Sequence, residues 1–376
     1  MNKDISVVTV PVAPPGKTSY GFLTLILLAY MLGNKFDANK QLYLNIMHSY
    51  KDKQGAAQRL LQDLKSLNIR MDNVLYDSDF FGQFEKDLLL LKQKGYVKIK
   101  EANILLCPCG KVDCLDLPDL QYNFVRSIDG RKVCGFCGQP CTSVTEKSLV
   151  FNFPELSESE KIKIIPAKFG KKVFEIYSKL QKSDMLISKH RNTGFSYVFG
   201  GQNFNIDIDF VLFNFLSNIN TNKRIIVGTS HVIYHMLMMH VMDRIKNKNK
   251  ENVFITMPYI QGQCQIPEIP NVENYKKHIY MLGSITKSND SQFNESLFQL
   301  ITKDRKENYL KTMYSILMQQ YDMDTKVSFF DNVNAFYMND FNMNNISRSV
   351  SMKLQYDKIQ RQINRKLLET TDTIEK

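Results

Sequence analysis

The stretch Ile5-Ser-Val-Val-Thr-Val-Pro-Val12, continued by Ala13-Pro-Pro-Gly-Lys-Thr-Ser19, decides the predicted fold of this chain. The first run is rich in β-branched residues and predicts a buried strand. The run of prolines and glycine predicts a tight turn, and the apolar sequence from Tyr20 onward predicts a helix. A strand, a glycine turn and a helix in this order are typical of the start of a nucleotide-binding α/β unit.

The rest of the chain continues this α/β pattern as far as Asn294, after which only helices are predicted. Gly95 is expected to cap a helix at its carboxyl end. Further strands are predicted at Gln41–Ile46, Arg224–Gly228 and Val253–Met257, and helices at Gln54–Leu67, Phe80–Lys94, Phe169–Leu186 and His231–Ile245. We therefore predict an α/β protein with a Rossmann-like parallel sheet formed by residues 1–104 and 151–290, a cysteine-rich zinc-binding insertion at 105–150, and a short helical C-terminal domain at 291–376.

The charge balance favours a polyanionic partner. The 376 residues include 49 Lys and Arg against 38 Asp and Glu, a net charge of +11. A lysine-rich composition from an AT-rich genome explains the charge equally well. The densest basic run, Arg244–Lys250, predicts a solvated helix end. Hydrophobic residues at 43% and charged residues at 23% exclude a disordered or fibrous chain.

Neither a membrane span nor a disulfide framework is expected. The longest apolar run, Gly21–Leu32, has about 12 residues, whereas a spanning helix needs roughly 20. Six of the seven cysteines fall between Cys107 and Cys141, which is typical of a metal site in a reducing compartment. We expect a cytoplasmic protein without a membrane partner.

The sharpest local motif is the knuckle Cys134-Gly-Phe-Cys137-Gly, which points two thiolates at one tetrahedral zinc ion. The spacing alone allows the second pair to come from Cys107, Cys109 and Cys114. A closed set of four thiolates predicts a structural rather than a catalytic zinc. Cys141 is then a spare thiol, and Cys264 is an ordinary core thiol.

Two other patterns suggest chemistry but do not fit it. The Gly16-Lys-Thr18 turn lacks the glycine that a P-loop needs five residues earlier, where Pro11 stands. Asp207 and Asp209 alternate in an apolar run, and we interpret them as an exposed strand face rather than as paired catalytic carboxylates.

Two degenerate motifs resemble the signatures of class I aminoacyl-tRNA synthetases. The run Ser19-Tyr-Gly-Phe22 stands where the family has His-x-Gly-His after a Pro-x-Gly turn, so both histidines are replaced. The run Gly283-Ser-Ile-Thr-Lys-Ser288 resembles the second signature, Lys-Met-Ser-Lys-Ser. Lys287 and Ser288 match it, and Ser284 replaces its first lysine.

The order of the remaining motifs is similar to the glutamyl/glutaminyl branch of that family, with methionyl-type enzymes next. The runs that carry this similarity are Leu60–Asp72, Leu75–Ser78, Lys94–Val97, Ile187–Gly194 and Gly228–His231. Cys107-Pro-Cys109, with Asp129-Gly-Arg131, resembles the zinc insertion of glutamyl-type enzymes. The resemblance therefore implies Cys107, Cys109, Cys134 and Cys137 as the zinc ligands.

The resemblance implies a divergent protein that binds ATP with Mg²⁺ and activates an amino acid or another carboxylate as an adenylate. The acceptor, tRNA or another RNA, stays open. The arginine that binds the glutamate side chain in glutamyl-type enzymes is absent from Asn45–Tyr50. We interpret His48 first as a structural or surface residue, with contact to a ligand as the alternative. The implied residues are catalytic Lys287, Ser19 and Lys17; nucleotide-binding Pro15, Gly16, Gly21, Gly228, Ser230 and Ser288; and substrate-binding Asn45, His48 and Tyr197. The alternative is a catalytically inactive paralogue that acts as a binding or assembly subunit on RNA.

Overall fold

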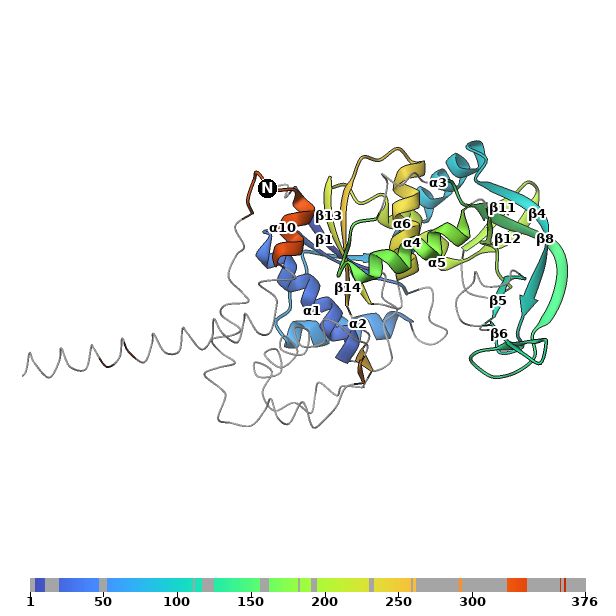
Figure 1. Ribbon diagram of the computed structural model, residues 1–376, viewed down its shortest axis with the longest axis horizontal. Coiled ribbons are helices and arrows are strands. Elements are labelled where there is room, and N and C mark those ends of the chain that lie inside the picture. Colours follow the sequence, from blue (N-terminus) through green and yellow to red (C-terminus); the bar gives the residue numbers. More distant parts are fainter. Residues whose placement is uncertain are drawn as a thin grey trace, which may run out of the picture.

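A six-stranded parallel sheet forms the centre of the computed structural model (Figure 1). The structure describes residues 4–10, 20–46, 53–110, 112–116, 125–155, 162–181, 183–190, 195–229, 233–257, 260–261, 291–292, 323–336, 359 and 362. The sheet order is β3 (Asn73–Tyr76), β2 (Asn39–Leu44), β1 (Ile5–Thr9), β13 (Lys223–Thr229), β14 (Glu251–Met257) and β9 (Ile164–Ile165). The chain winds outward from β1 through β2 to β3, and later outward on the other side from β13 to β14. The strand order therefore reverses between β1 and β13.

Helices cover both faces of this sheet because its central strands are buried on both sides. Alternate residues of β1 belong to different cores, with Val7 on one face and Val8 on the other. The first face packs against α1 (Tyr20–Lys35), α2 (Lys53–Ser66) and α10 (Phe329–Ala335). The second packs against α3 (Phe81–Gln93), α4 (Lys168–Leu180), α5 (Ile208–Leu216) and α6 (Ile233–Ile245). The predicted α/β class with a Rossmann-like parallel sheet is confirmed.

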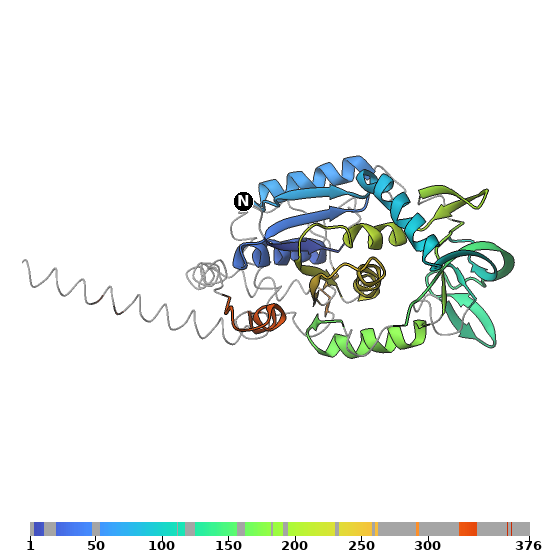
Figure 2. The ribbon, with the colours of Figure 1, turned by 90° about the horizontal axis from the view of Figure 1, so that it is seen from above.

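A second, antiparallel sheet lies at one end of the molecule, with α3 and α4 extending toward it (Figure 2). Its order is β10 (Asp184–Leu186), β8 (Thr142–Asn152), β4 (Val97–Leu106) and β5 (Asp113–Leu115). Three two-stranded pairs accompany the two sheets: β6 (Val125–Ile128) with β7 (Arg131–Cys134), β11 (Phe195–Phe199) with β12 (Gln202–Ile206), and β15 (Ile260–Gln261) with β16 (Ser291–Gln292). The six described cysteines, Cys107 to Cys141, lie on or next to the strands of this second sheet and of the β6–β7 hairpin.

The carboxyl end of α3 confirms the predicted glycine cap. The backbone N–H of Gly95 donates to the carbonyl of Lys92, and that of Tyr96 donates to the carbonyl of Leu91, each at 2.9 Å. This pair of bonds is the Schellman pattern, which satisfies the last carbonyls of a helix. The turn directs the chain from α3 into β4, and so connects the main sheet to the second one.

Two predicted elements differ from the structure. The helix predicted to run from Phe169 to Leu186 ends at Leu180, because Met185 and Leu186 pair with β8 as β10. The exposed strand face predicted for Asp207 and Asp209 is wrong, because α5 begins directly after Asp207. The Asp207 carboxylate accepts a hydrogen bond from the backbone N–H of Asp209 at 3.1 Å, as an N-cap does.

The amino-terminal edge of the main sheet is closed by a buried ion pair. Arg224, near the start of β13, is fully buried and pairs with Asp243 at the end of α6. Its Nε donates to Asn252 Oδ1 at 2.7 Å, and its Nη1 donates to the carbonyl of Leu216 at 2.8 Å. Burial lowers the pKa of Arg224 and raises that of Asp243, so the pairing only partly offsets the loss of solvation.

A second buried pair lies beside the first, and it corrects the prediction of a solvated helix end at Arg244–Lys250. Lys246 Nζ lies 2.6 Å from Asp87 Oδ2, with 2% and 7% of the two side chains exposed. The same amine donates to Ser217 Oγ at 2.6 Å and to the carbonyl of Asn214 at 2.9 Å. Burial lowers the pKa of Lys246 to about 8, against the opposing effect of Asp87.

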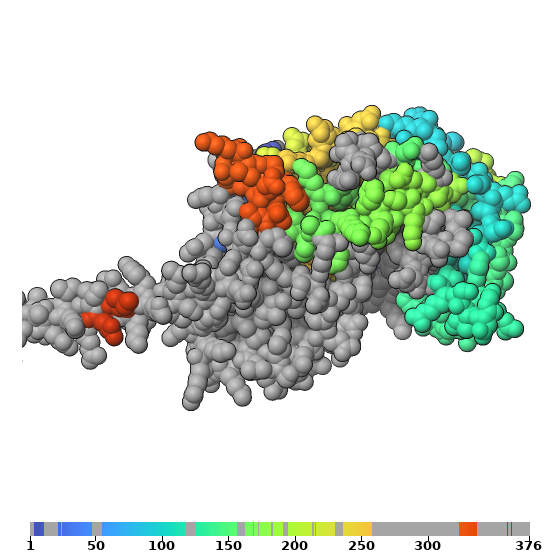
Figure 3. Space-filling model, viewed as in Figure 1, coloured from blue at the N-terminus to red at the C-terminus, as the bar shows by residue number. Residues whose placement is uncertain are grey.

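The helix α10 reaches the same edge from the C-terminal part of the chain. Its Phe329 and Val333 side chains, and Phe336 directly after it, are buried in the core that contains α1. Lys223 Nζ lies 5.8 Å from the centre of the Phe329 ring. Figure 3 shows α10 (orange) and the cysteine-bearing insertion (blue-green) well apart from each other, on opposite sides of α4 (green).

Candidate functional site

The point where the strand order reverses, at the carboxyl ends of β1 and β13, is the first candidate site. In open α/β sheets, ligands bind in the crevice outside the carboxyl ends of strands at such a point. The two strands stay paired to their ends, because the backbone N–H of Val10 donates to the carbonyl of Val227 at 2.8 Å. Gly228, a predicted nucleotide-binding residue, is buried at this edge and lies opposite Thr256 of β14.

Polar groups on the neighbouring strands fix the shape of this edge. Asp77, after β3, is fully buried. Its Oδ1 accepts from the backbone N–H groups of Ile46 at 3.2 Å and Ser78 at 2.9 Å. Thr9 Oγ1 accepts from the backbone N–H of Tyr43 at 3.1 Å. No sequence motif marks Thr9 or Asp77, but both stand at the ends of parallel strands, where side chains share one edge of the sheet.

Two of the predicted substrate-binding residues fall on described elements. Asn45 is buried directly after β2, at the carboxyl edge. Tyr197 lies on β11, where its ring stacks on Phe195 with ring centres 6.0 Å apart. Phe195 stacks in turn on Phe81, at the start of α3, with centres 4.7 Å apart. Tyr197 therefore belongs to an aromatic stack between the β11–β12 hairpin and α3.

Most of the predicted catalytic and phosphate-contacting residues lie outside the described residues. Besides Gly228, the exception is Gly21, which lies in the first turn of α1, directly after the predicted loop. The others are Lys17, Ser19, Pro15, Gly16, His48, Ser230, Lys287 and Ser288. Their roles stay predictions.

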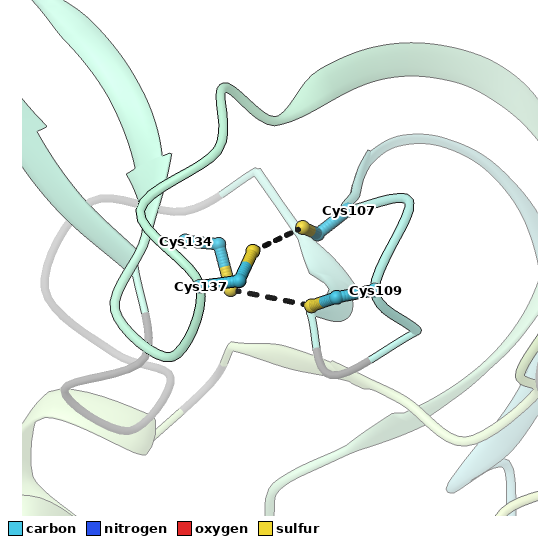
Figure 4. A group of neighbouring side chains, drawn as sticks. All are labelled: Cys107, Cys109, Cys134 and Cys137. Carbon is cyan, nitrogen blue, oxygen red and sulfur yellow. Dashed lines mark hydrogen bonds between the residues drawn. The ribbon is translucent and has the colours of Figure 1, made fainter.

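The second candidate site is a cluster of four cysteines, Cys107, Cys109, Cys134 and Cys137 (Figure 4). All four sulfur atoms lie within 4.8 Å of one another. Cys107 Sγ lies 3.4 Å from Cys137 Sγ, and Cys109 Sγ lies 3.6 Å from Cys134 Sγ. Cys107 and Cys134 are buried, while Cys109 and Cys137 are exposed.

These distances fit a tetrahedral metal ion. With Zn–S bonds of about 2.3 Å, sulfur atoms at the corners of a tetrahedron lie about 3.8 Å apart. Burial raises the pKa of Cys107. A metal ion binds cysteine as the thiolate, so metal binding at this site releases protons. Four clustered thiols of this geometry can hold a structural zinc ion.

Each pair of cysteines sits on a short loop that ends in glycine. Gly110 follows Cys109 with φ +71°, and Gly138 follows Cys137 with φ +74°, a left-handed conformation that glycine adopts without strain. The backbone N–H of Gly138 donates to the carbonyl of Cys134 at 2.9 Å, which closes the knuckle. Of the two pairings that the spacing leaves open, the structure brings in Cys107 and leaves Cys114 out of the cluster.

A third feature is a cavity of roughly 360 Å³ between β8 of the second sheet and β12. His190 lines it, with Nε2 3.0 Å from Glu146 Oε1 and Nδ1 3.3 Å from Asp113 Oδ1. Partial burial lowers the pKa of His190, but hydrogen bonds to Glu146 and Asp113 outweigh this effect and raise it above the usual value. No local sequence pattern predicts this triad, because its members lie far apart along the chain.

Among the described residues, no helix is long and apolar enough to span a membrane. No family model and no curated protein matches the chain. Solved structures do match it, among them methionyl-tRNA synthetase of Mycobacterium tuberculosis bound by methionyl-adenylate, with a TM-score of 0.60 and 11% identity over 84% of this chain and 72% of that chain. The chain has a fold similar to that of a class I aminoacyl-tRNA synthetase.

The synthetase-like fold extends over most of the chain. The apo form of the same Mycobacterium tuberculosis enzyme matches with a TM-score of 0.59 and 10% identity, over 93% of this chain and 79% of that chain. These two matched structures are of the methionyl type, which the sequence ranks second. The expected place in the glutamyl/glutaminyl branch is not shown.

Proposed function

We propose that this chain binds ATP with Mg²⁺ at the carboxyl edge of the main sheet and activates an amino acid as its adenylate. The observation that carries this function is the topology, in which two wound halves meet between β1 and β13. A synthetase of similar fold has been solved with methionyl-adenylate bound. Two of the predicted site residues, Gly228 and Asn45, are described by the structure and lie at this edge.

The proposed reaction joins a carboxylate to the α-phosphate of ATP. A carboxylate oxygen of the amino acid attacks the α-phosphorus, the bond to the α–β bridging oxygen breaks, and pyrophosphate leaves with its electrons. Lys287 is placed by the second signature to stabilise the charge that builds on pyrophosphate, and Lys17 and Ser19 act from the first turn. Mg²⁺ accompanies the phosphates and neutralises part of their charge.

The cysteine cluster has a structural role in this proposal. Cys107, Cys109, Cys134 and Cys137 hold one zinc ion, which joins the end of β4 to the β6–β7 hairpin. A metal assay on the purified chain should return close to one zinc per chain. A value well below one excludes the site.

The acceptor in this proposal is the end of a tRNA or another RNA, and the chain acts in the cytoplasm. The catalytically inactive paralogue is the second candidate, because Ser19, Phe22 and Ser284 replace three signature residues. It keeps the fold and the zinc site and contacts RNA without forming an adenylate.

Pyrophosphate exchange into ATP, measured over a panel of amino acids with and without bulk tRNA, separates the two functions. We expect exchange with at least one amino acid, and a loss of about 10²–10³ in rate for Lys287→Ala, the usual effect of removing one transition-state donor. Lys277→Ala, a lysine outside the signature, is the matched control and should keep the rate. No exchange and no ATP-dependent thermal shift would exclude the enzyme.

A further inference from the structure

A fifth thiol lies beside the four-cysteine cluster without belonging to it. We propose that Cys141 is a reserve ligand of this site, able to replace Cys107 on a thiophilic metal ion such as zinc. The inference rests on the proposed zinc site and is independent of adenylate formation.

The register of the second sheet brings Cys141 next to Cys107. In the antiparallel pairing of β4 with β8, Leu105 lies opposite Ser143 and Leu106 lies opposite Thr142. The ladder ends at this pair, and Cys107 and Cys141 are the residues that directly adjoin it on the two chain segments. Beyond the ladder, the backbone N–H of Cys107 donates to the carbonyl of Val112 at 3.0 Å.

The packing places the two cysteines at the same core. Cys107 is buried in a small core with Leu105, Val112 and Cys134, and the half-buried Cys141 packs against this core. Leu106, one residue earlier, packs in the neighbouring core instead, as the alternation along a strand requires.

The backbone around Cys141 is fixed close to the other ligands as well. Its N–H donates to the carbonyl of Lys132 at 2.8 Å, and Lys132 lies on β7 two residues before the ligand Cys134. Cys141 is therefore held between the strand that carries Cys107 and the hairpin that carries the knuckle. When it replaces Cys107, the metal keeps four sulfur ligands, the set that zinc and other thiophilic ions prefer.

Cys114 supplies the contrast. It also packs against the same core and is half-buried, but it pairs with Leu105, one same-face position before Cys107. It has no neighbouring ligand directly opposite. The same residue type on the same sheet face, in a different register position, is the matched control for Cys141.

Cobalt substitution tests the exchange directly, because each bound thiolate adds to the sulfur-to-cobalt charge-transfer absorption. The wild-type chain and Cys141→Ala should both show a four-thiolate Co²⁺ spectrum. Cys107→Ala and Cys107→Ala/Cys114→Ala should keep that spectrum, whereas Cys107→Ala/Cys141→Ala should fall to three thiolates. A three-thiolate spectrum for Cys107→Ala alone would overturn the proposal, while absence of metal from the wild-type chain would overturn the zinc site itself.

A second measurement applies if Cys107→Ala does not fold. A neighbouring thiol that binds zinc when Cys107 detaches slows the loss of zinc from the site. Cys141→Ala should therefore release zinc to an excess of chelator about tenfold faster than the wild-type chain. Tenfold is the lower end of the effect of residues that support a metal ligand. Cys114→Ala should release zinc at the wild-type rate. Equal rates for the wild-type chain and Cys141→Ala would contradict a reserve ligand.

Discussion

The two edges of the main sheet are built from opposite kinds of residue. At the amino-terminal edge, Arg224 and Lys246 each meet a carboxylate below the protein surface, and the chain itself satisfies their donors. At the carboxyl-terminal edge the described strands end in small or uncharged residues, among them Thr9 and Gly228, and the acidic Asp77 that follows β3 is bonded to backbone N–H groups. Ion pairs thus close one edge, whereas backbone amides and uncharged side chains shape the other.

The difference between the two edges separates the residues that stabilise the fold from those available to bind a ligand. Buried ion pairs are costly to break, because removal of one partner leaves an uncompensated charge. Backbone amides and small residues at strand ends instead leave room for phosphate groups to approach. Substitutions at the amino edge should therefore change unfolding, and substitutions at the carboxyl edge should change ligand binding.

The largest expected effect is at the amino edge. Arg224→Ala leaves Asp243 buried without its cation and should lower the free energy of unfolding by about 3–5 kcal/mol. Arg244→Ala removes an exposed arginine from the same helix as Asp243 and should change it by less than about 0.5 kcal/mol. Urea unfolding measures both. Equal effects would show that the amino edge is not closed by this pair.

The next effect is at the carboxyl edge. Gly228→Val adds a branched side chain at the end of β13 and should weaken ATP binding at least tenfold, about 1.4 kcal/mol. Gly82→Ala in α3 is the control, since a Cβ there meets no atom within 4 Å, and it should leave ATP binding unchanged. Calorimetric titration with ATP and Mg²⁺ is the measurement. An unchanged affinity for ATP in Gly228→Val would show that the nucleotide does not bind next to the end of β13.

The smallest effect lies outside both edges, at His190 on the second sheet. Its raised pKa means that folding favours the charged imidazole. The stabilisation is therefore complete below the ordinary pKa of about 6.5 and is lost as the pH rises through the folded pKa. Because 40% of the side chain is exposed, His190→Gln should cost less than about 1 kcal/mol at pH 6, and the cost should shrink toward pH 8. If the loss of stability in His190→Gln grew with pH, folding would favour the neutral imidazole instead.

The sequence predicts the parts of the fold that local patterns encode. The β-branched run before the turn, the glycine cap at Gly95 and the cysteine knuckle all appear where they are expected. It fails where distant contacts decide. The sequence predicts Asp207 in a strand, but its carboxylate caps α5. It predicts Lys246 in solvent, but in the fold Lys246 pairs with the buried Asp87.

The candidate sites divide in the same way. The spacing of Cys134 and Cys137 encodes a local loop, so the knuckle is visible in the sequence, but the choice of Cys107 over Cys114 depends on the pairing of β4 with β5. The triad at the cavity comes from three separate segments, with Asp113, Glu146 and His190 as its members. No local sequence pattern therefore predicts their contact.

Hydrogen–deuterium exchange with and without ATP and Mg²⁺ tests the contrast between the two edges most directly. We predict slower exchange in the peptides that end β1 and β13, around Val10 and Thr229, and no change around Arg224 and Asn252 at the other edge. Protection confined to the amino edge, or no ATP-dependent protection anywhere in the chain, would contradict it.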